Sequence, residues 1–323
     1  MLSRRQSQNK DEATQIPETG CGSLSCNGSL YRVGGVDKKD TYHIRSNGEK
    51  MKRVKLTVAY DGTAYHGWQL QPGAITIESE LNRALSELLG TEIQVIGASR
   101  TDSGVHALCN VAVFDTDAGM PAEKFSYALN QRLPEDIRVR CSQEVAPDFH
   151  PRHCNSIKTY EYHIYNAEFA VPTKRLYSYF TYIPLDVERM DRAGHYLEGE
   201  HDFKSFCSVN TQAETTVRRI LSVSVTETQN EGVAGLESAF TENLGEKAAG
   251  VWKSRKERDI CIRVSGTGFL YNMVRIIAGT LIEVGQGKRE PEDIQDILAA
   301  CDRSKAGPTA PACGLTLVDY CFF

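Results

Sequence analysis

The chain has 323 residues, of which 41% are hydrophobic and 24% are charged, and its formal net charge is −5. This composition is typical of a globular protein with one large or two small domains, and it excludes collagen-like, coiled-coil and wholly disordered chains. There is no run of about eighteen apolar residues, which excludes a transmembrane helix. The negative charge argues against nonspecific binding of nucleic acid, so any such contact would need a local basic cleft.

The first segment, residues 1–50, differs in composition from the rest of the chain. It is rich in Gly, Ser, Asn and Gln and has no sustained hydrophobic period, so we interpret it as a disordered or non-native extension. It lacks the apolar core of a secretory signal. The ten cysteines are scattered without a C-x-x-C pair, which favours reduced thiols. We therefore expect a cytoplasmic protein.

Residues 51–150 predict the element order β-α-β-β-α-β. Val54–Tyr60 alternates apolar and mixed residues, as in a half-buried strand. Ile77, Leu81 and Leu85 recur at helical spacing, and Gly90 is placed to end that helix. The further predicted elements are strands at 93–98 and 108–114, a helix that starts at Pro121 and a strand at 137–141.

Residues 151–323 predict a second half with additions. We expect strands at 158–165, 177–183, 220–225, 260–264 and 315–320, and helices at 187–197, 271–284 and 291–301. A polar stretch at 228–258 is most simply an inserted surface loop. The fold class is therefore α+β, with two ferredoxin-like halves whose mixed, mainly antiparallel sheets lie side by side around a central catalytic cleft.

The most informative segment is Gly97–Ala107, a short loop between two apolar strands. It offers a cation, a carboxylate and a flexible glycine. Asp-Ser-Gly is also common turn chemistry, so the residue types alone favour a polar turn.

As a whole, however, S-R-T-D-S-G-V-H-A at residues 99–107 resembles the signature of the tRNA pseudouridine synthase A family, the TruA-type enzymes. Other segments resemble further motifs of this family in the same order. These segments are residues 58–69, 149–162, 199–206, 268–275 and 310–315. The resemblance runs from about Val54 to Phe322, and only the extension and the 228–258 loop fall outside it.

The resemblance implies that uridine is isomerised to pseudouridine at nucleotides 38, 39 and 40 in the anticodon stem-loop of tRNA. The target nucleotide would have to leave its stack and enter a pocket. The resemblance further implies a homodimer that works without a metal or an organic cofactor, with tRNA as its partner and no membrane association.

Asp102 matches the catalytic aspartate of the family, expected to act as a nucleophile. Whether it attacks ribose C1′, adds to the base or assists a glycal route is open at this stage. Arg275 matches a basic residue of the third motif. A lone arginine in an apolar helix needs a partner, and Asp102 is the obvious one. The alternative is an arginine that reaches solvent from the helix face.

Two further residues are predicted to bind the substrate. Tyr160 matches the tyrosine that lies against the target base, although either Tyr160 or Tyr162 could instead belong to the core. Arg100 lies two residues before Asp102, on the same face of an extended segment. We expect it to occupy the space that the extruded base leaves, and the alternative is an ordinary salt bridge.

Two other classes of function stay open. A noncatalytic RNA-binding module would use exposed tyrosines on a ferredoxin-like sheet, but it would not need Asp102. A metal-dependent hydrolase would use the cluster at His150–Cys154, whose spacing matches no standard zinc pattern. Six basic residues could form a rim for nucleic acid that the net charge hides: Arg152, Lys158, Lys174, Arg175, Arg218 and Arg219.

Overall fold

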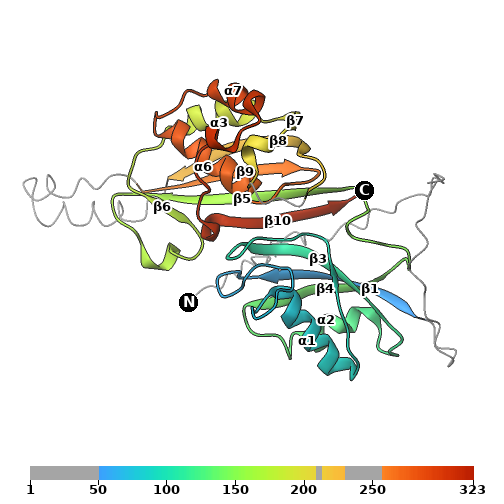
Figure 1. Cartoon of the computed structure of the whole chain (residues 1–323). Coiled ribbons are helices and arrows are strands. Elements are labelled where there is room, and N and C mark those ends of the chain that lie inside the picture. Colours follow the sequence, from blue (N-terminus) through green and yellow to red (C-terminus); the bar gives the residue numbers. More distant parts are fainter. Residues whose placement is uncertain (1–50, 209–212, 230–256) are drawn as a thin grey trace, which may run out of the picture. The chain divides into compact units, whose positions relative to one another are not determined.

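The structure, a computed structural model, describes residues 51–208, 213–229 and 257–323 (Figure 1). The predicted extension and residues 230–256 of the predicted inserted loop lie outside the described residues. The cysteines that the structure describes are all free thiols.

The first half follows the predicted order of elements. It consists of β1 (Lys52–Tyr60), α1 (Ile77–Leu89), β2 (Ile96–Gly97), β3 (His106–Thr116), α2 (Phe125–Leu129) and β4 (Ile137–Val145). Thr76 caps the start of α1 through its side chain, and Gly90 ends it in the left-handed conformation with a φ of 69°. The predicted helix stop at Gly90 is confirmed.

The second half contains the remaining strands and helices. These are β5 (Ser156–Asn166), β6 (Tyr179–Thr181), α3 (Val187–His195), β7 (Gly199–Asp202), β8 (Val217–Gln229), β9 (Arg258–Gly266), α6 (Met273–Gly285), α7 (Asp293–Ala300) and β10 (Leu315–Phe322). Each predicted strand and helix of this half has a counterpart, and β7 is additional.

The ten described strands form one sheet with the order β4-β1-β3-β10-β5-β9-β8-β7, in which β2 adds to β3 and β6 to β5. Most neighbours are antiparallel, whereas β10 runs parallel to β3 and β6 runs parallel to β5. The strands of the two halves meet where β3 lies beside β10 (Figure 1). A mixed, mainly antiparallel sheet in an α+β fold agrees with the prediction.

Two predicted elements of the first half are shorter in the structure. The strand predicted at 93–98 forms only at Ile96–Gly97, because side chains of α1 bind the backbone before it. Ser86 Oγ accepts from the Ile93 N–H at 2.9 Å, and Asn82 Oδ1 accepts from the Val95 N–H at 2.8 Å. These N–H groups are therefore not available to a neighbouring strand.

The helix predicted from Pro121 begins with one 3₁₀ turn and continues as α2 only to Leu129. The next residue, Asn130, donates to the Val139 carbonyl at 2.9 Å and accepts from the Val139 N–H at 2.8 Å. This pair of bonds ties the end of the helix to β4, so the helix stops although the hydrophobic spacing continues to Leu133.

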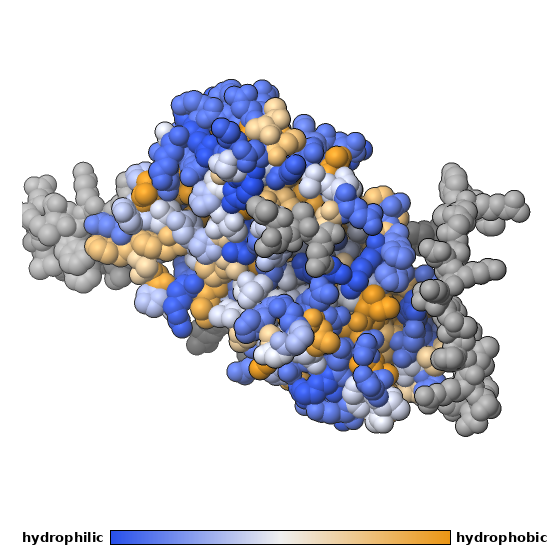
Figure 2. All heavy atoms as spheres, in the orientation of Figure 1, coloured by the Kyte–Doolittle hydropathy of each residue, from blue (hydrophilic) through white to orange (hydrophobic). Residues whose placement is uncertain are grey.

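Apolar side chains from both halves form the core. β1 alternates buried and partly exposed residues, and α6 is buried along most of its length. On the face shown in Figure 2, hydrophilic residues cover most of the described surface, with smaller hydrophobic areas between them. In the part of the chain that the structure describes, no helix has the length and hydropathy needed to cross a membrane.

Candidate active site

The loop between β2 and β3 carries Asp102 and is held in place by the segment that follows β1. The Thr101 carbonyl accepts from the Trp68 N–H at 3.1 Å, and its hydroxyl lies 2.7 Å from the Tyr60 hydroxyl. Gly67 has a φ of 83°, and a Cβ there would lie 2.6 Å from the Thr101 carbonyl oxygen. Only a glycine allows this close approach. The close packing and the two contacts of Thr101 hold the loop against the segment that follows β1 and against Tyr60.

Asp102, in the loop between β2 and β3, and Arg275, near the start of α6, come together from the two halves of the described chain. Asp102 Oδ2 lies 3.6 Å from Arg275 Nη1, and the two side chains are only 15% and 17% exposed. The predicted pairing of these residues is thereby confirmed, although they are far apart in the sequence. The alternative interpretation had Arg275 reaching solvent from the helix face, and the low exposure of its side chain contradicts this.

The guanidinium of Arg275 is oriented by groups other than Asp102. Its Nε donates to the Ala310 carbonyl at 2.8 Å, and its Nη1 donates to Asn272 Oδ1 at 2.8 Å. Asn272 precedes α6 in the left-handed conformation, with a φ of 60°, and its amide donates to Ser208 Oγ at 2.8 Å. These bonds fix the cation at the start of α6 so that it faces the carboxylate.

The closing segment of the chain ties both sides of the site together. Ala310 binds Arg275 through its carbonyl, and its N–H donates to the Arg275 carbonyl at 3.1 Å. Farther along, Thr316 and Leu317 of β10 pair with His106 and Ala107, which follow the Asp102 loop directly. One segment therefore sets the position of the cation and of the loop that bears the carboxylate.

Burial raises the pKa of Asp102 above the usual carboxyl value, and the Arg275 guanidinium opposes this rise by its charge and by hydrogen bonding. The net direction is upward, because withdrawal from water disfavours the charged form more than the cation favours it. The carboxyl group is thus poised by two opposed effects, a pattern that is common at functional sites.

Tyr160 lies on β5 and is 7% exposed. Its ring meets Phe269 edge to face, with 5.2 Å between the centroids. Burial raises the pKa of its phenol, and the charges of Tyr60 and Asp102 raise it further. Tyr160 is therefore a neutral hydroxyl at physiological pH, within electrostatic reach of Asp102.

Tyr162 is fully buried on the same face of β5, and its hydroxyl donates to the Pro311 carbonyl at 2.9 Å. A Cβ at Gly314 would lie 2.8 Å from its ring, so the ring is packed on the closing segment. Both candidate tyrosines lie in the buried core, and Tyr162 is the more deeply buried of the two.

Arg100 is exposed at the start of the Asp102 loop. No carboxylate of the described residues pairs with it, so the structure gives no support to the salt bridge that we considered as an alternative. A cation without such a partner stays available to a ligand.

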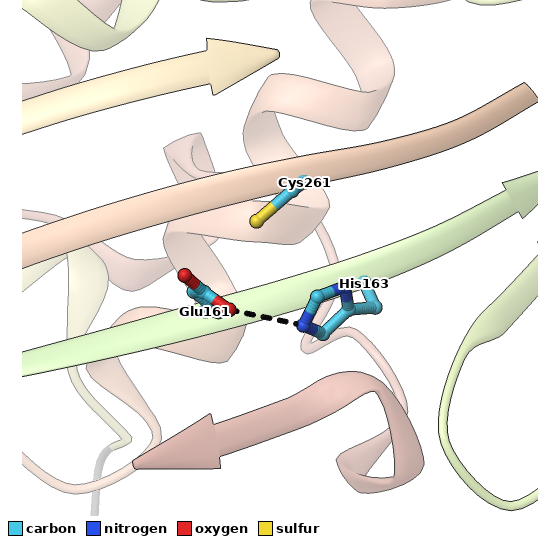
Figure 3. A group of neighbouring side chains, drawn as sticks. All are labelled: Glu161, His163 and Cys261. Atoms are coloured by element: carbon cyan, nitrogen blue, oxygen red, sulfur yellow. Dashed lines mark ion pairs between the residues drawn. The ribbon is translucent and has the colours of Figure 1, made fainter. Parts of the chain in front are cut away.

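The described residues contain one group of three potential metal ligands, Glu161, His163 and Cys261, and it was not predicted (Figure 3). In register, His163 lies opposite Cys261 on the neighbouring strands β5 and β9. Glu161 already pairs with Arg263 and lies 3.3 Å from His163 Nε2. Burial raises the pKa of the Cys261 thiol to about 12, so it is protonated at neutral pH. Glu161 thus already has Arg263 and His163 as partners.

The predicted cluster at His150–Cys154 contains no such group. The rings of His150 and His153 stack with 4.0 Å between centroids, and the His150 carbonyl accepts from two backbone N–H groups, as in a turn.

Sequence reasoning missed Tyr60, Asn110 and Asn272. Their hydrogen bonds hold the Asp102 loop and the Arg275 guanidinium in position. Asn110 is fully buried and donates to the Ser99 carbonyl at 3.0 Å and to the Tyr60 hydroxyl at 3.2 Å. A buried asparagine inside an apolar strand was the one signal that could have indicated this role, because such an amide needs partners.

Comparison with known proteins agrees with this geometry. A family model described as tRNA pseudouridine synthase matches residues 56–153 and 193–322, which include the Asp102 loop and the start of α6. The chain is 45% identical over 267 residues to the tRNA pseudouridine synthase A of Brevibacillus brevis, covering 83% of this chain and 98% of that protein. It is 44% identical over 268 residues to that of Ruminiclostridium cellulolyticum, with shares of 83% and 98%. The chain therefore belongs to the tRNA pseudouridine synthase family of isomerases.

Proposed function

We propose that this protein isomerises uridine to pseudouridine at nucleotides 38, 39 and 40 in the anticodon stem-loop of tRNA, with the Asp102 carboxylate as nucleophile. The observation that carries the proposal is the contact of 3.6 Å between Asp102 and Arg275, two largely buried ionisable groups brought together from opposite halves of the sheet. The named relatives, which are tRNA pseudouridine synthases A, support the same reaction.

The isomerisation breaks the bond from uracil N1 to ribose C1′, turns the base and joins its C5 to C1′. N1 gains a proton and C5 loses one, so the reaction needs no oxidant or second substrate. A carboxylate must be ionised to act as a nucleophile. In this site Arg275 supplies the charge that opposes protonation of the buried Asp102.

Two residues would hold the target nucleotide. The Tyr160 ring would lie against the base, and such stacking stabilises by about 1–3 kcal/mol. The Tyr160 hydroxyl stays protonated and can donate a hydrogen bond. Arg100, which is exposed beside Asp102, would fill the space that the base leaves in the RNA stack.

We extend the proposal to the architecture. The halves would be ferredoxin-like domains at 51–150 and 151–323 with the catalytic cleft between them. The strand order β4-β1-β3, with β2 on the far side of β3, supports this for the first half. We also propose a cytoplasmic homodimer that works without a metal or an organic cofactor.

The test is a variant with Asp102→Asn, which keeps the size of the side chain but removes its charge and its nucleophile. The substrate is tRNA labelled with tritium at uridine C5, because isomerisation releases that tritium to water and binding alone does not. We expect the rate of tritium release to fall well beyond about tenfold, while the affinity for tRNA stays close to that of the wild type.

Asp117→Asn is the matched control, since Asp117 is an exposed carboxylate beyond the end of β3, and it should keep full activity. Turnover of the Asp102→Asn variant within about tenfold of the wild type would end the assignment of Asp102. A wild-type protein that binds tRNA without releasing tritium would instead be the noncatalytic RNA-binding module.

A further inference from the structure

A cavity of about 340 Å³ lies beside the candidate active site. Its size falls within the range of about 300–1,000 Å³ that is usual for ligand pockets. The residues of its lining that matter here are Ala98, Arg152, Ser156, Lys158, Thr267 and Tyr320. Neither Asp102 nor Arg275 lines it, so the cavity is distinct from the place where the chemistry would occur.

The cavity and the active site nevertheless share walls. Lys158 precedes Tyr160 by two residues on β5, so both side chains lie on the same face of the sheet. Ala98 is followed by Ser99, whose hydroxyl lies close to the phenols of Tyr160 and Tyr320. A ligand in the cavity would therefore be a direct neighbour of a ligand on Tyr160.

The cavity gathers positive charge, and no side-chain carboxylate of the described residues pairs with Lys158 or Arg152 in its lining. Lys158 is also partly buried. Burial, together with the charge of Arg218, lowers the pKa of Lys158 to about 8. Arg218 packs over Gly268, the residue after Thr267, and burial lowers its pKa as well. Arg152 adds a third cation, which donates to the Gly97 carbonyl at 2.7 Å.

This arrangement is unfavourable for Lys158 in the empty protein, because desolvation and the charge of Arg218 both penalise its charged form. The attraction of an anion in the cavity would offset both effects. The arrangement therefore indicates an anionic ligand.

Tyr320 adds an aromatic wall. Lys158 Nζ lies 5.2 Å from the centroid of its ring, and the ring stacks on Phe322 with 4.8 Å between centroids. Cations beside an aromatic ring match the two parts of a nucleotide, since the phosphate binds the cations and the base stacks on the ring. A simple inorganic anion would not use this wall.

We propose that this cavity binds the nucleotide that adjoins the target uridine in the RNA, with Lys158 and Arg152 on its phosphate and Tyr320 against its base. The proposal rests on the proposed function, because it is the extruded uridine on Tyr160 that places its neighbour here. It assigns to the cavity the phosphodiester next to the reacting nucleotide.

The first experiment compares the affinities of two variants for an anticodon stem-loop RNA. Lys158→Met removes the partly buried charge in the cavity lining, and Lys305→Met removes the charge of an exposed lysine outside the cavity. We expect Lys158→Met to weaken binding by about ten- to hundredfold, as for a lost charge-assisted hydrogen bond, and Lys305→Met to have almost no effect. Lys158→Arg should restore part of the affinity.

The second experiment locates the contact. Single phosphates on either side of the target uridine are replaced by uncharged methylphosphonates, and each RNA is bound to the wild type and to Lys158→Met. At one position the replacement should weaken binding by the wild type but not weaken it further in the variant. If no position behaves in this way, Lys158 does not bind that phosphate and the proposal is wrong.

The third experiment tests the aromatic wall. Tyr320→Phe keeps the ring and should bind RNA like the wild type, whereas Tyr320→Leu should bind about five- to hundredfold more weakly. Equal affinities of the two variants, at equal melting temperatures, would overturn the stacking role.

These outcomes are separate from failure of the proposed function. That failure would appear as a wild-type protein that releases no tritium from labelled tRNA. Failure of the present proposal would appear as an active wild type whose Lys158→Met variant binds RNA as tightly as Lys305→Met.

Discussion

At the scale of single residues, the Asp102 carboxyl is subject to two opposed effects. Withdrawal from water favours its neutral form, whereas the Arg275 guanidinium at 3.6 Å favours the ionised form. Because the pKa of Asp102 is raised even with the cation present, any loss of that cation moves the pKa farther upward. The pH above which Asp102 is ionised therefore depends on Arg275.

We predict that Arg275→Met, which keeps the length of the side chain, shifts the acid limb of the single-turnover rate profile to higher pH. The shift should be on the order of 1–3 units, because the carboxylate must be ionised to react and loses its stabilising charge. Arg275→Lys should recover part of the shift. An unchanged acid limb together with weaker tRNA binding would show that Arg275 contacts phosphate instead.

The pairing of Asp102 with Arg275 was predictable from the sequence, but the groups that orient Arg275 were not. The family resemblance singled out both residues, and the need of a charged residue in an apolar helix for a partner then indicated that Arg275 pairs with Asp102. The Ala310 carbonyl that orients Arg275 leaves no mark in the sequence, since every residue has a carbonyl. The left-handed conformation of Asn272 likewise depends on contacts that only the folded chain makes.

At the scale of elements, α6 packs against the closing segment with no room to spare. A Cβ at Gly279 would lie 1.8 Å from the Pro308 carbonyl oxygen. The same helix carries Arg275 and the same segment carries Ala310, so their separation sets the geometry of the active site.

We predict that Gly279→Ala lowers the free energy of unfolding by roughly 1–3 kcal/mol, as overpacking usually does, and slows turnover by moving Arg275. Denaturant unfolding and tritium release measure the two effects. The control is Gly119→Ala, at a surface position where a Cβ meets nothing within 4 Å. A Gly279→Ala variant as stable and active as this control would show that the two backbones can separate freely.

The existence and order of the elements were predictable because hydrophobic spacing reports which face is buried. The ends of the elements were harder to predict wherever a side chain hydrogen-bonds to a backbone group that would otherwise continue the strand or helix. Ser86 and Asn82 shorten β2, and Asn130 shortens α2, each by hydrogen bonds to residues that are not adjacent in sequence. Periodicity carries no information about such bonds.

At the scale of the whole molecule, a net charge of −5 has to be reconciled with a polyanionic substrate. The crowded cations around Lys158 show how a local basic site can exist in an acidic protein. A second copy of the chain could extend this positive surface, since a homodimer presents each basic region twice.

We therefore predict a homodimer in solution, as the family resemblance implies. Light scattering at working concentration should give twice the 35.9 kDa of a single chain. A mass of one chain, both alone and with tRNA bound, would contradict the prediction.

The position of β10 has a consequence for how the protein is made. This strand is translated after all the other described strands, yet it lies between β3 and β5. Roughly 200 residues separate β3 from β10, which at about 5–20 residues per second corresponds to some 10–40 s on the ribosome. During that time the parts of β3 and β5 that β10 will cover, His106–Ala107 and Ser156–Tyr162, keep an unpaired edge, which exposes the nascent chain to wrong pairing. The same delay also applies to the active site, because Arg275 can bind the Ala310 carbonyl only after all the described strands before β10 have been made.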